Sequence, residues 1–128
     1  IGVRQLFDII DAPSTEAADN DKPKLVMDKG QVEFRDVWLS YRENEPVLRG
    51  ISLVAEAGQM SALVGPSGGG KSTILNTILR LYEPQSGAIE IDGQNIASVS
   101  RHSLRQQIAY VGQDVFLFHG TIRDNIAF

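Results

Sequence analysis

The apolar positions at the start of the chain recur at helical spacing. In residues 1–12 they fall on one face of a short amphipathic helix, which Pro13 ends. Residues 14–24 are small and polar with one proline, so we interpret them as a solvated linker. The chain begins with Ile1 in mid-pattern and ends at Phe128 inside a predicted helical turn. We therefore expect it to be part of a longer protein.

Two strands are predicted next. Apolar and polar residues alternate over 32–39, with a slip at Asp36 that indicates a β-bulge or a turn. After a polar loop, residues 47–58 form a second predicted strand, which Gly58 ends. We expect these two strands to form an antiparallel unit.

The rest of the chain alternates short apolar runs with helical spacing. The predicted elements are a buried strand over 60–64, a helix over 72–82, a strand over 88–91 with a tight turn at Asp92-Gly93, a helix from Ser100 to about Gln106, and a buried strand over 108–112. The order β-β-β-α-β-α-β predicts an α/β fold class: part of a nucleotide-binding fold with an antiparallel β flank.

Composition and charge narrow the possible functions. The chain has 128 residues, which is enough for one domain, and 42% of them are hydrophobic. Its net charge of −4 lacks the basic footprint of a nucleic-acid-binding protein, so we expect no nucleic-acid partner. The absence of cysteine excludes disulfides, thiolate zinc sites and a thiol nucleophile. No apolar run approaches the length of a membrane-spanning helix.

The strongest chemical signal is the sequence GPSGGGKS over residues 65–72, which fits G-x-x-x-x-G-K-[ST] in full. Its glycines are Gly65, Gly68, Gly69 and Gly70. They allow positive φ and a close approach of backbone N–H groups to a phosphate. The helix that follows adds the positive end of its dipole.

The last two residues of the motif supply charge and a metal ligand. We expect Lys71 to place a mobile cation against the β- and γ-phosphates, and the Ser72 hydroxyl to bind Mg²⁺. The alternative interpretation is a glycine-rich turn followed by a surface lysine. The position of the motif between a predicted strand and an amphipathic helix argues against that alternative.

Four stretches resemble the first half of the nucleotide-binding domain of an exporter-type ATP-binding cassette (ABC) transporter. They are VEFRDVWLSYRENEPVLRGISL, GPSGGGKST, SGAIEIDGQNI and YVGQDVFLFHGTIRDNIAF. The resemblance implies a P-loop NTPase core with an antiparallel β subdomain over residues 31–128. Residues 1–30 resemble the end of the last membrane helix and its linker.

The resemblance also implies roles for individual residues. Tyr41 matches the aromatic residue that stacks on adenine, and Gln113 matches the glutamine that reaches Mg²⁺ and the attacking water. Thr73 would add a hydroxyl near the α-phosphate, and Val47 either lines the base or has a strand role. The implied nucleotide-binding set is Tyr41, Gly65, Ser67, Gly68, Gly69, Gly70, Lys71, Ser72 and Thr73. Lys71 and Gln113 are the implied catalytic residues, and Ser72 and Gln113 the implied metal ligands.

The family's acidic strand end, signature sequence and switch histidine do not occur in these 128 residues. Because hydrolysis needs a positioned water and stabilised charge, we expect this stretch alone to bind nucleotide without efficient hydrolysis. The resemblance implies ATP and Mg²⁺ as cofactors. It also implies a second nucleotide-binding domain as partner in a dimer, a fused or associated transmembrane domain, and a location at the cytoplasmic face of a membrane, such as the bacterial plasma membrane.

Two other function classes share the phosphate loop. One is a soluble phosphate-loop NTPase, such as a nucleotide kinase or a GTPase. The β flank before the loop and the absence of an Asn-Lys-x-Asp sequence argue against this class. The other is an ABC ATPase with no role in transport, which an upstream region of membrane helices would exclude. The sequence leaves the transported substrate open, and the dimer can have like or unlike subunits.

Overall fold

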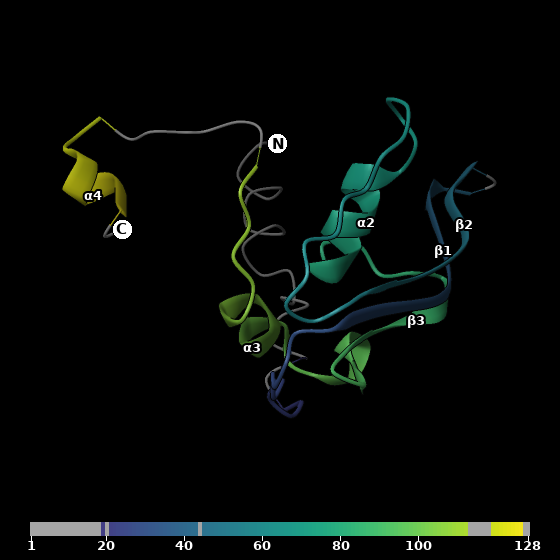
Figure 1. Ribbon diagram of the computed structural model, residues 1–128, viewed down its shortest axis with the longest axis horizontal. Coiled ribbons are helices and arrows are strands. Elements are labelled where there is room, and N and C mark those ends of the chain that lie inside the picture. The colour runs from purple at the N-terminus through teal and green to yellow at the C-terminus, as the bar shows by residue number, and fades with distance from the viewer. Residues whose placement is uncertain (1–18, 20, 44, 113–118, 127–128) are drawn as a thin grey trace, which may run out of the picture.

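The structure is a four-stranded sheet, and the helices over Lys71–Ile78 and Arg101–Gln106 lie beside it (Figure 1). It is a computed structural model that describes residues 19, 21–43, 45–112 and 119–126. In chain order the elements are β1 (Val32–Arg42), β2 (Glu45–Ala55), α2 (Lys71–Ile78), β3 (Ser86–Ile91), β4 (Gln94–Asn95), a 3-10 turn (Ile96–Ser98), α3 (Arg101–Gln106) and α4 (Ile122–Ile126). Among the described residues, no helix is both long and apolar enough to cross a membrane. The helix predicted for residues 1–12 lies outside this part of the chain.

The sheet is antiparallel throughout, with the strand order β2-β1-β3-β4. The predicted antiparallel pair is therefore confirmed. The predicted irregularity is also confirmed, because the pairing of β1 with β2 shifts between Phe34 and Val37, and Asp36 has a φ of +46°. Gly87 of β3 faces this bulge. A Cβ at Gly87 would lie 2.3 Å from the Asp36 carbonyl oxygen, so only glycine fits there.

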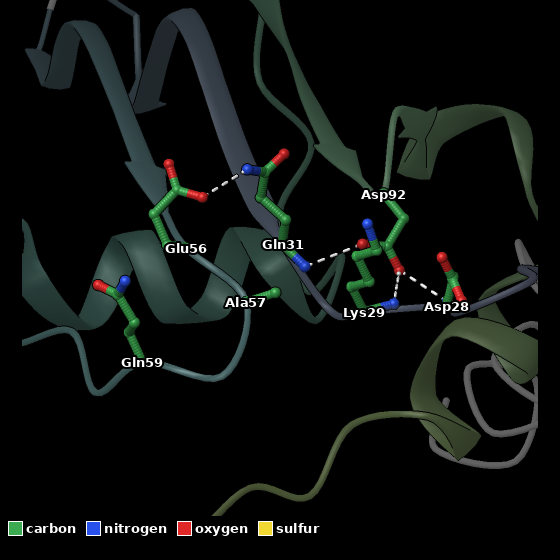
Figure 2. A pocket seen from close by; sticks show the side chains of 7 residues that line it. All are labelled: Asp28, Lys29, Gln31, Glu56, Ala57, Gln59 and Asp92. Carbon is green, nitrogen blue, oxygen red and sulfur yellow. Dashed lines mark hydrogen bonds between the residues drawn. The ribbon is translucent and has the colours of Figure 1, made fainter.

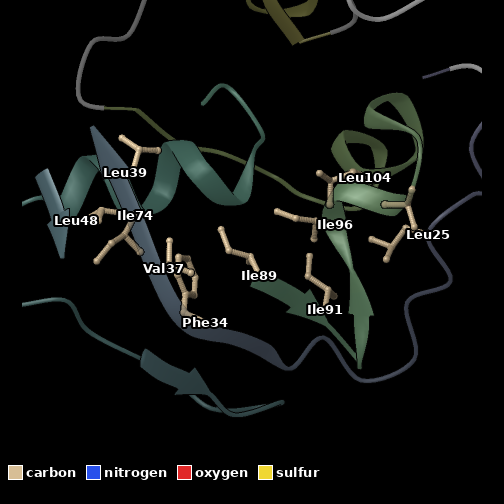
Figure 3. Packing of buried hydrophobic residues seen from close by; sticks show 11 residues of the cluster. Leu25, Phe34, Val37, Leu39, Leu48, Ile74, Ile89, Ile91, Ile96 and Leu104 are labelled. Atoms are coloured by element: carbon tan, nitrogen blue, oxygen red, sulfur yellow. The ribbon is translucent and has the colours of Figure 1, made fainter. Parts of the chain in front are cut away.

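Buried apolar side chains lie between the sheet and α2 and continue toward α3 (Figure 3). The cluster consists of Leu25, Phe34, Val37, Leu39, Leu48, Ile74, Ile89, Ile91, Ile96, Val99 and Leu104. Ile74 is the contribution of α2, and Leu48 is that of β2. Burying each such side chain stabilises the folded state by about 1.5–3 kcal/mol, so this packing holds α2 against one face of the sheet.

The β3–β4 turn and the start of α3 agree with the sequence analysis. Asp92 and Gly93 have φ values of +49° and +75°, as a tight hairpin turn requires. The Ser100 hydroxyl accepts a hydrogen bond from the Ser103 N–H at 3.2 Å and caps α3. Leu104 of α3 is completely buried, as its inward position predicts.

Two predicted strands are wrong. Residues 60–64 and 108–112 form no strand, although both runs are apolar. Met60 and Val64 are 100% and 91% exposed, and Val111 is 91% exposed. A strand needs a neighbour for its N–H and C=O groups, and no strand in the described part of the chain pairs with either run. The apolar residues of these runs predicted burial, but the sequence pattern does not say which element would pack over them.

The helix predicted over 72–82 is shorter in the structure, because α2 ends in a Schellman motif. Arg80 has a φ of +51°, in the left-handed region. Its N–H donates to the Thr77 carbonyl oxygen at 3.0 Å. The Leu81 N–H donates to the Asn76 carbonyl oxygen, also at 3.0 Å. These two bonds satisfy carbonyl groups that the helix end leaves free and turn the chain away from the helix axis.

Asp19 shows that the linker predicted over 14–24 is not solvated throughout. Its side chain is only 8% exposed and lies 2.7 Å from Lys22 Nζ, 3.3 Å from the Arg80 guanidinium and 3.2 Å from Arg101 Nε. The hydrogen bond from Lys22, together with the two guanidinium groups, holds the pKa of this carboxyl below its usual range. The chain before β1 is thus fixed to the end of α2 and the start of α3.

Candidate functional site

The predicted phosphate loop is a turn that leads directly into α2. The Gly69 N–H donates to the Pro66 carbonyl oxygen at 3.2 Å and closes the turn. Gly68 and Gly70 have φ values of +79° and +83°, which glycine adopts at little cost. Gly69 does not have a positive φ, so the expectation of a left-handed backbone is wrong for that glycine. A Cβ at Gly70 would lie 3.1 Å from Leu48 Cδ2, so β2 leaves no room for a side chain there.

The first turn of α2 has backbone N–H groups without a side-chain cap. Gly70 is the N-cap residue and makes no side-chain cap hydrogen bond, because glycine has no side chain that could accept from the first N–H groups of the helix. The first hydrogen bond of the helix is donated by the Ile74 N–H to the Gly70 carbonyl oxygen at 2.9 Å. No acidic residue lies in the first turn to offset the positive end of the dipole. An anion is the partner that best fits this arrangement.

Lys71 contacts its own loop. Its ammonium donates to the carbonyl oxygens of Gly65, at 2.9 Å, and Pro66, at 2.6 Å. In the structure the side chain is folded back over the turn, where two carbonyl dipoles partly neutralise its charge. Its predicted role as a mobile cation facing phosphates stays a prediction.

The remaining loop residues leave room for a ligand. A Cβ at Gly65 or Gly68 would meet no atom within 4 Å, so open space lies beside the loop at both positions. Ser67 and Ser72 are exposed, which leaves their hydroxyls accessible. A hard hydroxyl oxygen beside an anion site suits Mg²⁺, so the residues present fit both a polyphosphate and its metal.

Tyr41 and Thr73, which are 32 positions apart, meet beside the loop. The Tyr41 hydroxyl and the Thr73 hydroxyl share a hydrogen bond of 2.9 Å. Tyr41 lies near the end of β1 and is 47% exposed, whereas Thr73 lies buried in the first turn of α2. Val47 of β2 packs against Gly70, whose added Cβ would lie 3.5 Å from the Val47 carbonyl oxygen. The structure thus brings Tyr41, Val47 and Thr73 to the loop.

Two residues at this site were missed by the sequence analysis. Tyr82 packs edge-on against the Tyr41 ring, with ring centroids 4.7 Å apart and an interplanar angle of 75°. Gln85 joins Ser40 and Tyr41 in lining a pocket of about 480 Å³. Tyr82 continued the apolar spacing of the predicted helix, so it was assigned to the helix face. No local pattern marks Gln85.

Gln113 lies outside the described residues, so its predicted catalytic and metal-binding roles stay predictions. Ser72 is the predicted metal ligand that the structure describes. No group of three or more His, Cys, Asp or Glu residues that could hold a metal ion occurs within the described ranges. Within the described residues, Ser72 is therefore the predicted ligand for Mg²⁺, and oxygen atoms of the bound phosphates would complete its coordination.

A second pocket, of about 470 Å³, lies beside Asp92 (Figure 2). The Asp92 carboxylate accepts hydrogen bonds from the backbone N–H groups of four consecutive residues: Asp28, Lys29, Gly30 and Gln31. These bonds, that from Gly30 foremost, lower the pKa of Asp92 to about 2. Because four backbone N–H groups already donate to this carboxylate, it connects the chain before β1 to the β3–β4 turn. We therefore assign Asp92 a structural role and not a catalytic one.

Known proteins resemble this chain along nearly its whole length. The ABC transporter family model matches residues 48–127, more than half of the chain. A fatty acid ABC transporter ATP-binding/permease protein of Mycobacterium tuberculosis is 48% identical over 124 residues, which cover 97% of this chain and 19% of that protein. An ATP-dependent lipid A-core flippase of Saccharophagus degradans is 45% identical over 123 residues, 96% of this chain and 21% of that protein.

A solved structure is also similar. The structure of a bacterial Atm1-family ABC exporter with ATP bound matches with a TM-score of 0.87 and 43% sequence identity, over 97% of this chain and 22% of that one. This chain therefore spans about a fifth of the length of each protein it is compared with.

Proposed function

Because the chain belongs to the ABC transporter family, we propose that residues 65–73 bind ATP and that the chain is part of an ATPase domain that powers export. One observation carries the proposal. The glycine turn leads into an uncapped helix N-terminus, with a lysine, an exposed hydroxyl and open space beside it. This combination suits a triphosphate with its Mg²⁺.

Binding would change the partners of the loop's polar groups. The Lys71 ammonium would exchange the carbonyl oxygens of Gly65 and Pro66 for phosphate oxygens, which carry full negative charge. The first N–H groups of α2 would donate to the same phosphates. The Ser72 hydroxyl would hold Mg²⁺, whose chemistry is to neutralise charge on the β- and γ-phosphates. Gln113 would add a second metal contact.

The base and ribose would lie toward β1. Tyr41 is half exposed and stands beside the first turn of α2, so its ring is accessible to a base stacked on it. Stacking of a base on an aromatic ring is worth about 1–3 kcal/mol in nucleic-acid complexes. The proposed nucleotide site therefore runs from Tyr41 to the phosphate loop.

The properties of the whole protein follow from the family and are proposals. They are a second nucleotide-binding domain, a fused or associated transmembrane domain, and a place at the cytoplasmic face of a membrane. Residues 1–30 would connect to the membrane part, and residues 31–128 would form the first half of the ATP-binding domain. These 128 residues alone would bind nucleotide without efficient hydrolysis. The substrate is unidentified, since relatives of nearly equal identity are named for fatty acid and for lipid A-core.

Replacing the lysine of the loop tests the proposal. In the full-length protein, Lys71→Ala removes the mobile cation, so we expect ATP turnover to fall at least about 100-fold, as loss of a charge-stabilising donor does elsewhere. Lys24→Ala is the matched control, because Lys24 is an exposed lysine remote in sequence from the loop. ATP hydrolysis measured by phosphate release should be unchanged in the control. Turnover retained by Lys71→Ala contradicts the proposal.

A further inference from the structure

Tyr41 lies at an irregular point of β1. The pairing of β1 with β2 shifts between Ser40 and Arg42, so Tyr41 falls within a break in the ladder. On the other side, the pairing of β1 with β3 ends at Trp38, opposite Ser86. Ser40 therefore lies beyond the end of β3 and has no strand neighbour on that side. The ladder alone does not fix the backbone that carries the Tyr41 ring.

The side chain of Gln85 takes the place of the absent strand. Its Oε1 accepts from the Ser40 N–H at 2.8 Å, and its Nε2 donates to the Ser40 carbonyl oxygen at 3.0 Å. The Gln85 backbone N–H also donates to the Trp38 carbonyl oxygen at 2.9 Å. We call the two side-chain bonds an amide pair. They hold the residue immediately before Tyr41 in both directions, as a neighbouring strand would.

Tyr82 supports the ring itself. Its ring packs against the Tyr41 ring in a T-shaped contact, while 47% of Tyr41 stays exposed. Tyr82 and Gln85 both lie in the connection between α2 and β3. The Tyr41 hydroxyl is bonded to Thr73 in the first turn of α2. The position of the Tyr41 ring is therefore set by α2 and the connection after it, as well as by β1.

We propose that Gln85 and Tyr82 are positioning residues for Tyr41, which hold its ring where a nucleotide base stacks and so raise affinity for the base without affecting the phosphates. This inference rests on the proposed ATP site. It adds that the segment following the phosphate-loop helix contributes to base recognition. Neither residue needs to touch the nucleotide.

The chain offers a matched control for the amide pair. Gln94 of β4 makes the same two bonds to the backbone N–H and carbonyl of Val26, in the segment before β1. Gln85→Glu and Gln94→Glu therefore cause the same chemical change: the NH₂ group that donates to the backbone carbonyl becomes a negatively charged carboxylate oxygen, so two acceptors face each other. Only the first of them lies next to Tyr41.

Binding of two probes to the full-length protein tests the inference. MgATP reports base and phosphate contacts together, and magnesium tripolyphosphate reports phosphate contacts alone. Loss of a stacked base weakens binding about 5- to 150-fold, so a displaced ring should weaken it less. We expect Gln85→Glu to raise the Kd for MgATP about three- to tenfold and to leave the Kd for tripolyphosphate within about twofold. Gln94→Glu should change neither value.

A second pair of variants tests the ring contact independently of the amide pair. Tyr82→Phe keeps the aromatic edge and should bind MgATP like the wild type. Tyr82→Ala removes the edge and should raise the Kd for MgATP alone. This pair remains informative if Gln85→Glu does not fold.

The inference is overturned if Gln85→Glu weakens both probes equally, if Gln94→Glu matches its effect, or if Tyr82→Ala leaves MgATP binding unchanged. It also fails if the wild type binds tripolyphosphate as tightly as MgATP, although the proposed phosphate site would then stand. A wild type that binds neither probe refutes the proposed function itself.

Discussion

Asp92 illustrates how one side chain organises a distant segment. Its two carboxylate oxygens accept from four consecutive backbone N–H groups, 61 to 64 positions earlier in the chain. A backbone N–H group that is removed from water and has no acceptor destabilises the fold. The Asp92 carboxylate supplies the acceptors that water or a neighbouring strand would otherwise supply. Gln94, two residues later, holds Val26 through two hydrogen bonds from its side-chain amide to the Val26 backbone. The residues around the β3–β4 turn thus fix the path of the chain into β1.

Removing the charge of Asp92 should lower stability in a pH-dependent way. Asp92→Asn turns an NH₂ group toward N–H donors, so we expect a lower thermal midpoint at pH 7. Its folded-state pKa of about 2 lies below the ordinary value of 3.8. The stabilisation is therefore complete above about pH 4 and is lost as the pH falls toward 2.

Thermal unfolding of the wild type and of Asp92→Asn across this pH range checks the prediction. The difference between the thermal unfolding midpoints of the two proteins should become smaller as the pH falls from 4 to 2. Asp21→Asn, a change at an exposed aspartate near the same segment, serves as control. A gap that stays constant with pH would mean that the charge of Asp92 is not what stabilises the loop.

Residue types and spacing identified the loop from Gly65 to Ser72 because its chemistry is local in the sequence. Its turn, the uncapped helix start and the lysine all follow from eight consecutive residues. Gln85 and Asp92 were beyond reach for the opposite reason. Each acts on backbone groups about 45 to 64 positions away, and nothing near them in the sequence indicates those partners.

At the scale of elements, α2 is held at both ends. Its first turn borders the phosphate loop and Tyr41, and its last turn closes with a Schellman motif at Arg80. Arg80 is an unusual choice for this left-handed position, where glycine is common. The Arg80 guanidinium is buried, donates to the Val99 carbonyl oxygen at 2.8 Å and lies 2.7 Å from Glu83. These contacts of the guanidinium group explain why arginine occupies this position in place of glycine.

Two substitutions at Arg80 separate the backbone from the side chain. Both Arg80→Ala and Arg80→Gly lose the ion pairs, which should cost about 2–4 kcal/mol. Glycine adopts the positive φ more easily, so Arg80→Gly should be more stable than Arg80→Ala by about 1 kcal/mol. Denaturant unfolding gives both differences. Equal stability of the two variants would argue against a left-handed backbone at this residue.

Elements were predicted well where their partners are near in the sequence. The β1–β2 pair, the β3–β4 turn and the capped start of α3 are all local, and each was found. The runs at 60–64 and 108–112 were assigned as buried strands from hydrophobicity alone. A strand depends on a neighbour that supplies hydrogen bonds, and spacing within a run contains no information about that neighbour.

For the molecule as a whole, the cluster around Asp19 joins segments that are far apart in the chain. Asp19 precedes β1, Arg80 follows α2 and Arg101 begins α3, and all three side chains are at most 15% exposed. Glu83 lies 2.7 Å from both guanidinium groups. Asp19 is therefore tied by ion pairs to the end of α2 and the start of α3.

Neutralising Asp19 should be much more costly than breaking a surface pair. Asp19→Asn removes a carboxylate that lies within 3.3 Å of the Arg80 and Arg101 guanidinium groups, so we expect a clear loss in the free energy of unfolding. Glu33→Gln breaks the exposed pair with Arg35, which solvent screens, and should cost much less. Chemical denaturation at pH 7 compares the two. Equal losses in the free energy of unfolding would mean that Asp19 stabilises the fold no more than an exposed ion pair does.

The self-contained contact of Lys71 has a consequence for which anions the loop accepts. Its ammonium already has two oxygen partners, the carbonyls of Gly65 and Pro66. A chain of linked phosphates has enough charged oxygens to replace both partners and still reach the helix N–H groups, whereas a chloride ion is a single atom. If residues 65–73 bind ATP as proposed, the resting lysine would therefore favour polyphosphates over single-atom anions.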